Sequence, residues 1–471
     1  MAPVPIPLAY RSSAGRYGQD GAARLMNLYA EEIGDEGKVK AALYAIGGMS
    51  RFATLTGSGG IRAMLALSDD ELIAVAGRVL STVDAGGGTV VRGGVVSDGL
   101  VTMARNRANP AQVMITCDGS TSMLQSGSLT TFTDADLQPA NSVCNYSGYF
   151  VFTHENGAFT IAGPDSIDVD ALDTGSANTG ADTLLRGVSR GTDVLLFGTR
   201  TIEAWQDTGG DPFPLSRVTS VKDEDGNQVG ILSAASIPGD DLPVLFISAD
   251  GVVRQLGGYQ AVRVSNHEIE RLISADASPS TIRGFYWTER GHRFYTLTGS
   301  TWTKTLDMVV GGWHDRKSKG LDRWRCGSVV QLGNRPIFGD IAQARLYALD
   351  ADLSTEDGDE IDCHVICPPV YMQSGARLPV ANVVLDVIRG VGLNSTAPQN
   401  LDPVMLLDYS EDGAKTWSPE RQIAMGRQGQ SLTRLVARRL GRISHVGRSW
   451  RMRCTASVVR AIMGARMNDD G

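Results

Sequence analysis

The stretch PVLFISADGVVRQLGG at residues 243–258 decides the expected fold, because it has the pattern of a β-hairpin. A short apolar run ends at Asp250-Gly251, a pair that favours a tight turn, and a second run follows. Six further segments with this pattern start at residues 71, 112, 148, 193, 292 and 335, so successive hairpins lie about 44 residues apart. Turns are expected in three of them at Asp118-Gly119, Asn156-Gly157 and Gly299-Ser300.

This period is typical of a β-propeller. One hairpin supplies two strands, and the rest of each period leaves room for two more, which is the spacing of a four-stranded blade. Blades packed radially cover one another's faces, which a lone sheet could not bury. We therefore predict an all-β fold with a β-propeller of about seven blades over residues 61–355, or six if one hairpin is an insertion. A pair of β-sandwiches is the alternative fold.

The composition agrees with a large, turn-rich β protein. Of 471 residues 55 are glycine and 42% are apolar, so the chain has the apolar surface that a disordered protein lacks. The glycines follow no three-residue period, which excludes collagen. A mainly helical fold is disfavoured, because each glycine would cost a helix about 1 kcal/mol. No run of 18 apolar residues predicts a membrane segment, and the N-terminus lacks the pattern of a signal peptide.

Two regions flank the expected propeller. Residues 1–60 are interpreted as an N-terminal arm that could supply a strand to close the ring, with a short helix around GAARLMNLYAEE (21–32). Residues 356–471 contain five or six strand candidates and predict a small β-sandwich-like domain.

The arginines of this last domain are its most unusual feature. Residues 421–471 carry a net charge of +9, which leaves −17 for the first 420 residues. Because the arginines alternate with apolar residues, we expect structured strands. Arg438, Arg439 and Arg442 cluster beside these apolar strands, and we therefore expect them at a protein interface, where arginine forks pair with carboxylates. Direct DNA binding is the competing interpretation. The interface hypothesis names seven residues: Arg434, Arg438, Arg439, Arg442, Arg448, Arg451 and Arg453.

One motif resembles a structural element of known propellers. SEDGAKTW (410–417) is similar to the Asp-box of sialidases, with Gly413 one place early and Ala414 where the box has glycine. Ser410 and Asp412 are expected to cap a tight turn over Trp417. The box is a folding device, and no spacing identifies the catalytic residues of a sialidase. We therefore predict no enzyme activity, no catalytic residue and no cofactor.

Two further patterns could bind metals but have simpler explanations. Asp223, Asp225 and Asn227 alternate as in a calcium loop, although the glycine and glutamate of that loop are missing, so a solvated turn is favoured. Cys363 and Cys367 flank His364, but without a second ligand pair buried thiols are favoured over zinc.

Several segments together resemble one protein family. They are RLMNLYAEE (24–32), VLLFGTRTIEAWQDTGGDPFP (194–214), LDMVVGGWHDRKSKG (306–320), DYSEDGAKTWSPERQIAMGRQG (408–429) and RRLGRISHVGRSWRMRC (438–454). In this order they look like the tail hub proteins of short-tailed bacteriophages, also called tail nozzles or packaged-DNA stabilisation proteins.

The resemblance implies a structural protein of the virion tail that is made in the host cytoplasm. Six copies would form a ring below the portal and its adaptor protein, and this homohexamer would continue the DNA channel and touch DNA only transiently. The ring would retain packaged DNA until ejection, anchor tail fibres or spikes and hold a needle or plug protein. The alternatives are a carbohydrate-active, sialidase-like propeller enzyme and a cellular propeller scaffold.

Overall fold

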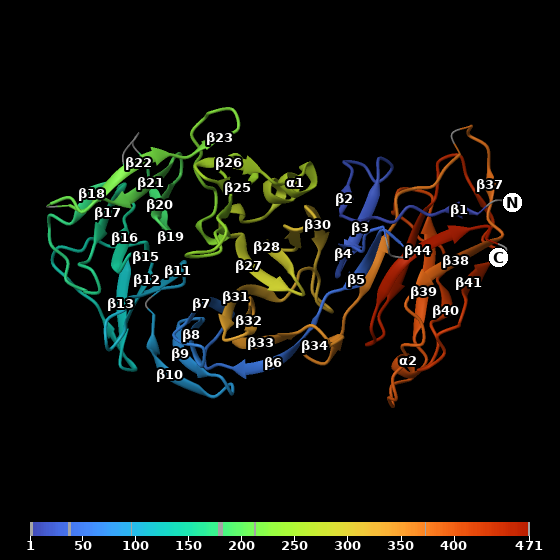
Figure 1. The fold of residues 1–471 in the computed structure, drawn as a ribbon, viewed down its shortest axis with the longest axis horizontal. Coiled ribbons are helices and arrows are strands. Elements are labelled where there is room, and N and C mark those ends of the chain that lie inside the picture. Colours follow the sequence, from blue (N-terminus) through green and yellow to red (C-terminus); the bar gives the residue numbers. More distant parts are fainter. Residues whose placement is uncertain are drawn as a thin grey trace.

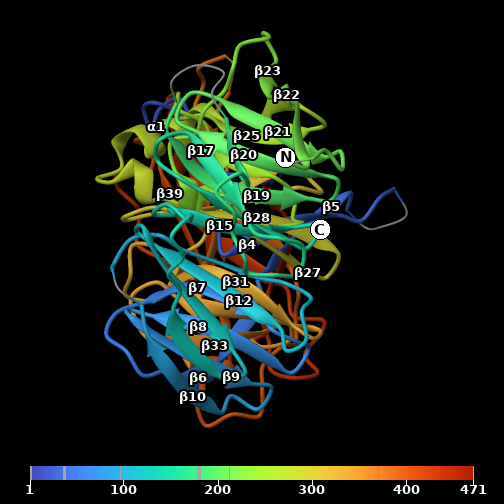
Figure 2. The same cartoon turned by 90° about the vertical axis from the view of Figure 1, so that its left-hand side faces the viewer.

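The computed structural model describes residues 3–35, 39–95, 97–177, 182–211, 213–372 and 374–469. A ring of β-sheets and a β-sandwich lie side by side, and both ends of the chain lie at the sandwich (Figure 1). Figure 2 shows the ring from the side opposite the sandwich. Neither α-helix in the described ranges has the length and apolar character that a membrane span requires.

Four sheets of the ring are each built from four consecutive antiparallel strands. They are β7 (Ile61–Ala66), β8 (Glu71–Ala76), β9 (Val79–Asp84) and β10 (Thr89–Gly94); β11 (Val101–Arg105), β12 (Gln112–Cys117), β13 (Ser120–Gln125) and β14 (Ser128–Thr131); β15 (Ser142–Tyr146), β16 (Tyr149–Thr153), β17 (Ala158–Ile161) and β18 (Thr174–Ser176); and β19 (Leu184–Arg190), β20 (Asp193–Gly198), β21 (Ile202–Asp207) and β22 (Leu215–Ser220).

The fifth blade is irregular next to the axis. The 3-10 helix η1 (Ala234–Ser236) occupies the innermost place, and a single bridge joins Ile231 to Ser248. The rest of the blade consists of β24 (Leu245–Ile247), β25 (Val253–Gly257), β26 (Gln260–Arg263) and, parallel to β26, β23 (Lys222–Asp223). Helix α1 (His267–Ala275) and η2 (Pro279–Thr281) then lead into the sixth blade.

The last two blades join the ring to the N-terminal part of the chain. The sixth consists of β27 (Arg283–Glu289), β28 (His292–Thr298), β29 (Thr303–Asp307) and β30 (Gly312–Asp315). The seventh consists of β31 (Cys326–Leu332), β32 (Arg335–Asp340), β33 (Arg345–Asp350) and β6 (Gly48–Thr54), with β34 (Thr355–Glu356) and β35 (Asp359–Glu360) beyond it. Because β6 precedes the first blade in sequence and pairs antiparallel with β33, it closes the ring.

The predicted propeller is confirmed, and the described residues form seven blades. Each of the seven hairpins expected from the sequence supplies two adjacent strands of a different blade, from β8–β9 to β32–β33. The expected turns lie where predicted: Asp118 and Gly119 both have positive φ, of 52° and 82°, between β12 and β13. This conformation suits the right-handed twist of a two-residue hairpin.

The predicted sandwich is confirmed as well, but the N-terminal segment contributes to both of its layers. One layer is formed by β1 (Val4–Pro5), β4 (Leu28–Glu32), β5 (Ala41–Ala45), β44 (Ala461–Met467), β38 (Asn382–Val387) and β41 (Leu435–Arg438). The other is formed by β2 (Ser13–Ala14), β3 (Ala22–Met26), β36 (Cys363–Ile366), β43 (Ser449–Cys454), β39 (Val404–Ser410) and β40 (Arg421–Ala424). A ribbon of β37 (Leu378–Pro379) and β42 (Arg442–Ile443) and the short helix α2 (Pro398–Leu401) complete it.

The helix expected over residues 21–32 is wrong. These residues form β3 and β4, separated by Asn27, which has a positive φ of 53°. The Asn27 side chain donates hydrogen bonds to the carbonyls of Lys317 and Asp362, both at 2.9 Å. Pairing with distant strands and burial of Leu25 and Leu28 thus outweigh the local preference of this Ala- and Leu-containing segment for a helix.

The N-terminal segment is fixed to the propeller by a buried polar cluster. Lys304 on β29 is only 2% exposed, and its Nζ lies 2.6 Å from Glu268 Oε1 and 2.8 Å from Asp315 Oδ1. Asp315 also accepts a hydrogen bond from Ser12 Oγ (2.7 Å), and Glu268 accepts one from the amide of Ala14 (2.9 Å). The carboxylates of Glu268 and Asp315 therefore neutralise the charge of Lys304 and also hold β2 against the sixth blade and α1.

Candidate assembly surface

Three exposed arginines lie at one end of the sandwich, and we call Arg438, Arg439 and Arg442 the arginine edge. Arg438 is the last residue of β41, the outer strand of its layer, and lies opposite Asn382. Arg439 follows with a positive φ of 59°, and its amide donates to the carbonyl of Ala381 at 2.9 Å. Arg442 belongs to the β37–β42 ribbon. Among the described residues none of these guanidinium groups has an ion-pair partner.

Apolar side chains are exposed beside the ribbon. Tyr371 is 57% exposed and Val446 is 50% exposed, and the two segments meet where Val370 bridges to Arg448 and Tyr371 lies against Gly447. Aromatic residues and arginine are enriched at the centres of protein interfaces, where they bury large areas and form directional hydrogen bonds. The sequence did not single out Tyr371, because one tyrosine in a loop carries no periodic signal.

Arg448 serves the interior of the sandwich. It is only 2% exposed, and its guanidinium lies 3.7 Å from the ring centroid of Tyr409 and 2.7 Å from Glu411 Oε1. It also donates to two backbone carbonyl groups next to or within the arginine edge, those of Leu440 (2.6 Å) and Arg442 (2.9 Å). Arg448 therefore positions the arginine edge within the subunit, and its own charge is paired with Glu411.

The other three arginines of the hypothesis have contacts within the subunit. Arg451 lies opposite Asp408 across β43 and β39 and forms a two-pronged ion pair with it. Its guanidinium also lies 4.1 Å from the ring centroid of Trp417. Arg453 pairs with Glu420, and Arg434 donates to the carbonyl of Asp469 at 3.2 Å. Of the seven residues, the structure thus brings together on an open surface only those of the arginine edge.

The turn at residues 410–417 is capped by hydrogen bonds from its own side chains. Ser410 Oγ donates to Asp412 Oδ1 (2.7 Å) and accepts from the amide of Ala414 (2.9 Å). Hydrogen bonds from the hydroxyl and the amide of Thr416 hold the pKa of Asp412 well below its usual range, with further support from Ser410. Gly413 and Ala414 both have positive φ, of 76° and 65°. These polar groups are used within the turn, as in a folding device.

The two segments considered as metal sites have other structural roles. Cys363 and Cys367 are buried free thiols, and burial raises the pKa of each to about 12. Asp223 Oδ1 accepts the amides of Asp225 (3.0 Å) and Asn227 (2.8 Å), which makes the acidic segment a capped turn. Within the ranges described, no three His, Cys, Asp or Glu side chains are grouped so that they could hold a metal ion.

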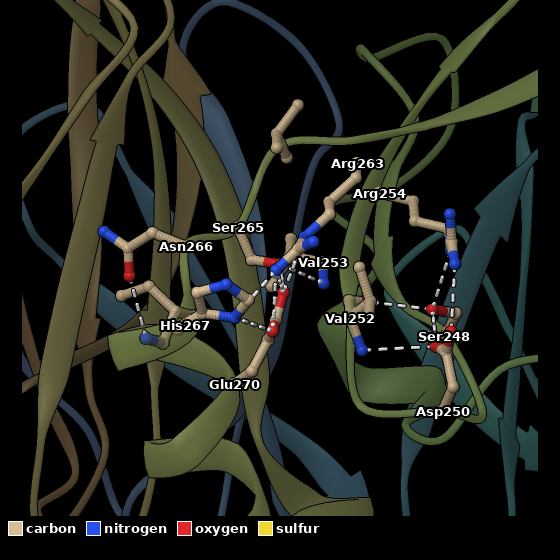
Figure 3. A network of polar contacts seen from close by, with 12 residues as sticks. Ser248, Asp250, Val252, Val253, Arg254, Arg263, Ser265, Asn266, His267 and Glu270 are labelled. Carbon is tan, nitrogen blue, oxygen red and sulfur yellow. Dashed lines mark hydrogen bonds and ion pairs between the residues drawn. The ribbon is translucent and has the colours of Figure 1, made fainter. Parts of the chain in front are cut away.

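A polar network that the sequence did not reveal links the fifth blade to α1 (Figure 3). Glu270 accepts hydrogen bonds from Arg263 Nε (2.8 Å) and Ser265 Oγ (2.7 Å). On the blade side, Arg254 Nη2 donates to Asp250 Oδ2 at 2.9 Å. Burial opposes ionisation of Asp250, but hydrogen bonds from Ser248 and Arg254 outweigh it and lower the pKa. The network fixes α1 on the outside of the ring. Of the residues in the network, only Asn266, the N-cap of α1, belongs to a pattern that can be recognised in the sequence.

Comparisons with known proteins agree with this architecture. The family model described as the β-propeller of bacteriophage P22 Gp10 matches residues 22–354, and that described as the β-sandwich of the same protein matches residues 364–469. No curated protein sequence matches the chain.

Among solved structures, the WD40 β-propeller domain of Doa1 is similar over 64% of this chain and 97% of its own, with 12% identity and a TM-score of 0.43. The structure of U3-55K is similar over 64% of this chain and 98% of its own, with 11% identity and a TM-score of 0.42. The two family models cover both structural units in order and account for most of the chain. The chain therefore belongs to the bacteriophage P22 Gp10 family of DNA-stabilisation and tail proteins.

Proposed function

We propose that the chain is the subunit of a ring in a phage tail, located below the portal and its adaptor protein. The observation that supports this most directly is the match of both family models, in order, to the propeller and the sandwich. The ring, a hexamer in this proposal, continues the DNA channel and retains packaged DNA. It also anchors tail fibres or spikes and a needle or plug protein.

The arginine edge supplies the contact between subunits or with the adaptor. Its guanidinium groups are exposed, have no ion-pair partner among the described residues and adjoin exposed Tyr371 and Val446. Arginine forks pair with carboxylates of a neighbour, and such pairs fix orientation. The rest of the chain is acidic, with −17 over the first 420 residues, so acidic partners are available on a second copy. A mostly acidic subunit also avoids strong attraction to DNA phosphates in the channel.

Charge reversal of the arginine edge tests the proposal. The triple variant Arg438→Glu, Arg439→Glu and Arg442→Glu should fold normally, because these side chains are exposed, but should fail to form rings or tails. The control is a triple Glu variant of Arg107, Arg200 and Arg293, which are exposed on the propeller, and it should assemble. Native mass spectrometry and electron microscopy of particles measure assembly. Normal assembly of the first variant would contradict the interface, and assembled particles that lose DNA at high salt would favour DNA contact instead.

A further inference from the structure

A cavity of about 1120 Å³ lies on the axis of the propeller. Its walls are formed by the inner strands β7, β11, β19, β27 and β31 and by the segment that contains η1, so nearly every blade contributes. Three arginines line it, Arg62, Arg186 and Arg283, against two carboxylates, Asp98 and Asp240. Such a cavity could simply be filled by water, and the arrangement of the charges decides whether it selects a ligand.

Each axial arginine bridges from its own blade to another part of the ring. Arg186 Nη1 donates to the carbonyls of Ala234 and Ile237 in the fifth blade, both at 2.8 Å. Arg62 donates to the carbonyl of Ser97 (2.7 Å), which precedes the second blade. Arg283, on the sixth blade, reaches past the seventh to the carbonyl of Ile61 on the first (2.7 Å). Carbonyl oxygens accept these hydrogen bonds but do not neutralise the charges.

The positive charge is concentrated on one side of the cavity. Asp240 lies near Arg186, but Arg283 has no carboxylate within ion-pair distance among the described residues. Burial and the neighbouring charges of Arg62 and Arg323 lower the pKa of Arg283 to about 10. Asp98, which lies near Arg62, is already paired with Arg78. The side formed by Arg62 and Arg283 therefore has a surplus of positive charge in a partly desolvated place, where opposite charge is attracted strongly.

Hydrogen-bond donors remain available on this side. Arg283 uses only Nη1, and no acceptor among the described residues contacts its Nε or Nη2. Ser328 Oγ, on the seventh blade, is enclosed against Gly339 and is not a donor that a ligand in the cavity can reach. The free Nε and Nη2 of Arg283 form one edge of a guanidinium fork, a donor set that suits tetrahedral oxyanions.

We propose that the Arg62–Arg283 side of the axial cavity binds a phosphate-class oxyanion, either inorganic phosphate or the terminal phosphate of a small monoester. The bound anion neutralises the surplus charge and joins the first and sixth blades, which lie on either side of the blade that closes the ring. This site is independent of ring assembly and of the arginine edge, and one ion per subunit is expected.

Titration of the purified full chain tests this site. Inorganic phosphate is added in a buffer free of phosphate and sulfate, and binding is followed by calorimetry, with thermal unfolding as a second measurement. Chloride at equal ionic strength controls for screening, and glycerol 3-phosphate distinguishes a monoester from the free ion. Saturable binding with one ion per subunit and a raised Tm is expected. The absence of saturable binding for both phosphates would overturn the proposal.

Variants locate the ion. Arg283→Met should weaken phosphate binding at least about tenfold, because it removes a charged donor. Ser280→Glu places a carboxylate at an exposed residue of the cavity wall, so it should weaken binding without affecting folding. Arg293→Met, an exposed arginine outside the cavity, is the control and should bind as the unaltered chain does. If Arg283→Met does not fold, unchanged affinity in Ser280→Glu alone would still contradict the site.

Discussion

Gly18 and Gly413 meet backbone to backbone, so that a Cβ atom on Gly18 would lie only 2.1 Å from the carbonyl oxygen of Gly413. The first residue belongs to the hairpin turn between β2 and β3, and the second to the capped turn after β39. Two segments from opposite ends of the chain are thus in direct contact at the sandwich, and the absence of side chains at both positions allows it.

Gly18→Ala should therefore destabilise this contact. The added methyl group must displace backbone, which typically costs about 1–3 kcal/mol. We expect a lower Tm and faster amide hydrogen exchange at residues 410–417. Gly257→Ala is the matched control, because no atom lies within 4 Å of its added Cβ. Equal stability of the two variants would show that the turns do not depend on close approach.

Ala414→Gly should stabilise the protein. Ala414 has a φ of 65°, a left-handed conformation that costs a residue with a Cβ about 1 kcal/mol more than glycine. The greater freedom of glycine in the unfolded chain offsets part of the gain, so we expect an increase of about 0.5 kcal/mol in the free energy of unfolding. Ala424→Gly in strand β40 should have the opposite sign. If Ala414→Gly lowered the stability, the left-handed conformation of Ala414 would not be strained.

Lys304→Met should be strongly destabilising. The substitution removes the buried cation between the carboxylates of Glu268 and Asp315 and leaves them only the partly exposed Arg24, 3.9 Å and 3.7 Å away. Because breaking a buried pair on one side costs about 3–5 kcal/mol, we expect a loss near the lower end of this range. Chemical denaturation should show this loss. Lys319→Met removes an exposed lysine that lies 3.4 Å from Glu360, and it should change stability by less than about 0.5 kcal/mol. If Lys304→Met and Lys319→Met lowered the free energy of unfolding by similar amounts, the buried cluster would not anchor the N-terminal segment.

Asp240→Asn should remove part of the pH dependence of stability. Burial raises the pKa of Asp240 from 3.8 to about 6, so the folded protein binds this proton more tightly than the unfolded chain. The resulting stabilisation is fully present below about pH 4 and is lost as the pH rises through about 6. Asparagine stays neutral and can still accept the hydrogen bond that the amide of Ser189 donates to Asp240 Oδ1.

The expected difference has a defined sign. Near pH 4 the Asn variant and the unaltered chain should be equally stable, and near pH 7 the variant should be more stable by up to about 3 kcal/mol. Urea denaturation across this range measures it. If the free energy of unfolding changed with pH in the same way in both proteins, burial would not raise the pKa of Asp240.

The propeller could be predicted because its signal is local. Each hairpin brings its own apolar runs and turn residues, such as Asp118-Gly119, and repeats them at a regular distance. The N-terminal strands could not be predicted in this way. Ala22–Met26 and Leu28–Glu32 contain good helix formers, and only their partners β36 and β5 make them strands.

The sequence could indicate the cluster of Arg438, Arg439 and Arg442, but it could not separate the exposed arginines of this domain from the buried ones. The sequence shows an arginine-rich end, but Arg442 and Arg448 lie six positions apart, one exposed and the other buried under Tyr409 and Glu411. Which arginine faces outward depends on strand register and on distant partners. Arg62 and Arg283 of the axial cavity lie in different blades, so no spacing could have connected them.

The closure of the ring by β6 and the place of β4 and β5 in the sandwich impose an order on biosynthesis. Strand β5 needs β44, which a ribosome adding about 5–20 residues per second delivers some tens of seconds later. During this interval the early strands have unpaired edges, which are prone to pair with other nascent chains. The first-made part of the molecule is thus among the last to reach its final partners, and a chaperone that shields residues 22–54 would raise the yield of native subunits.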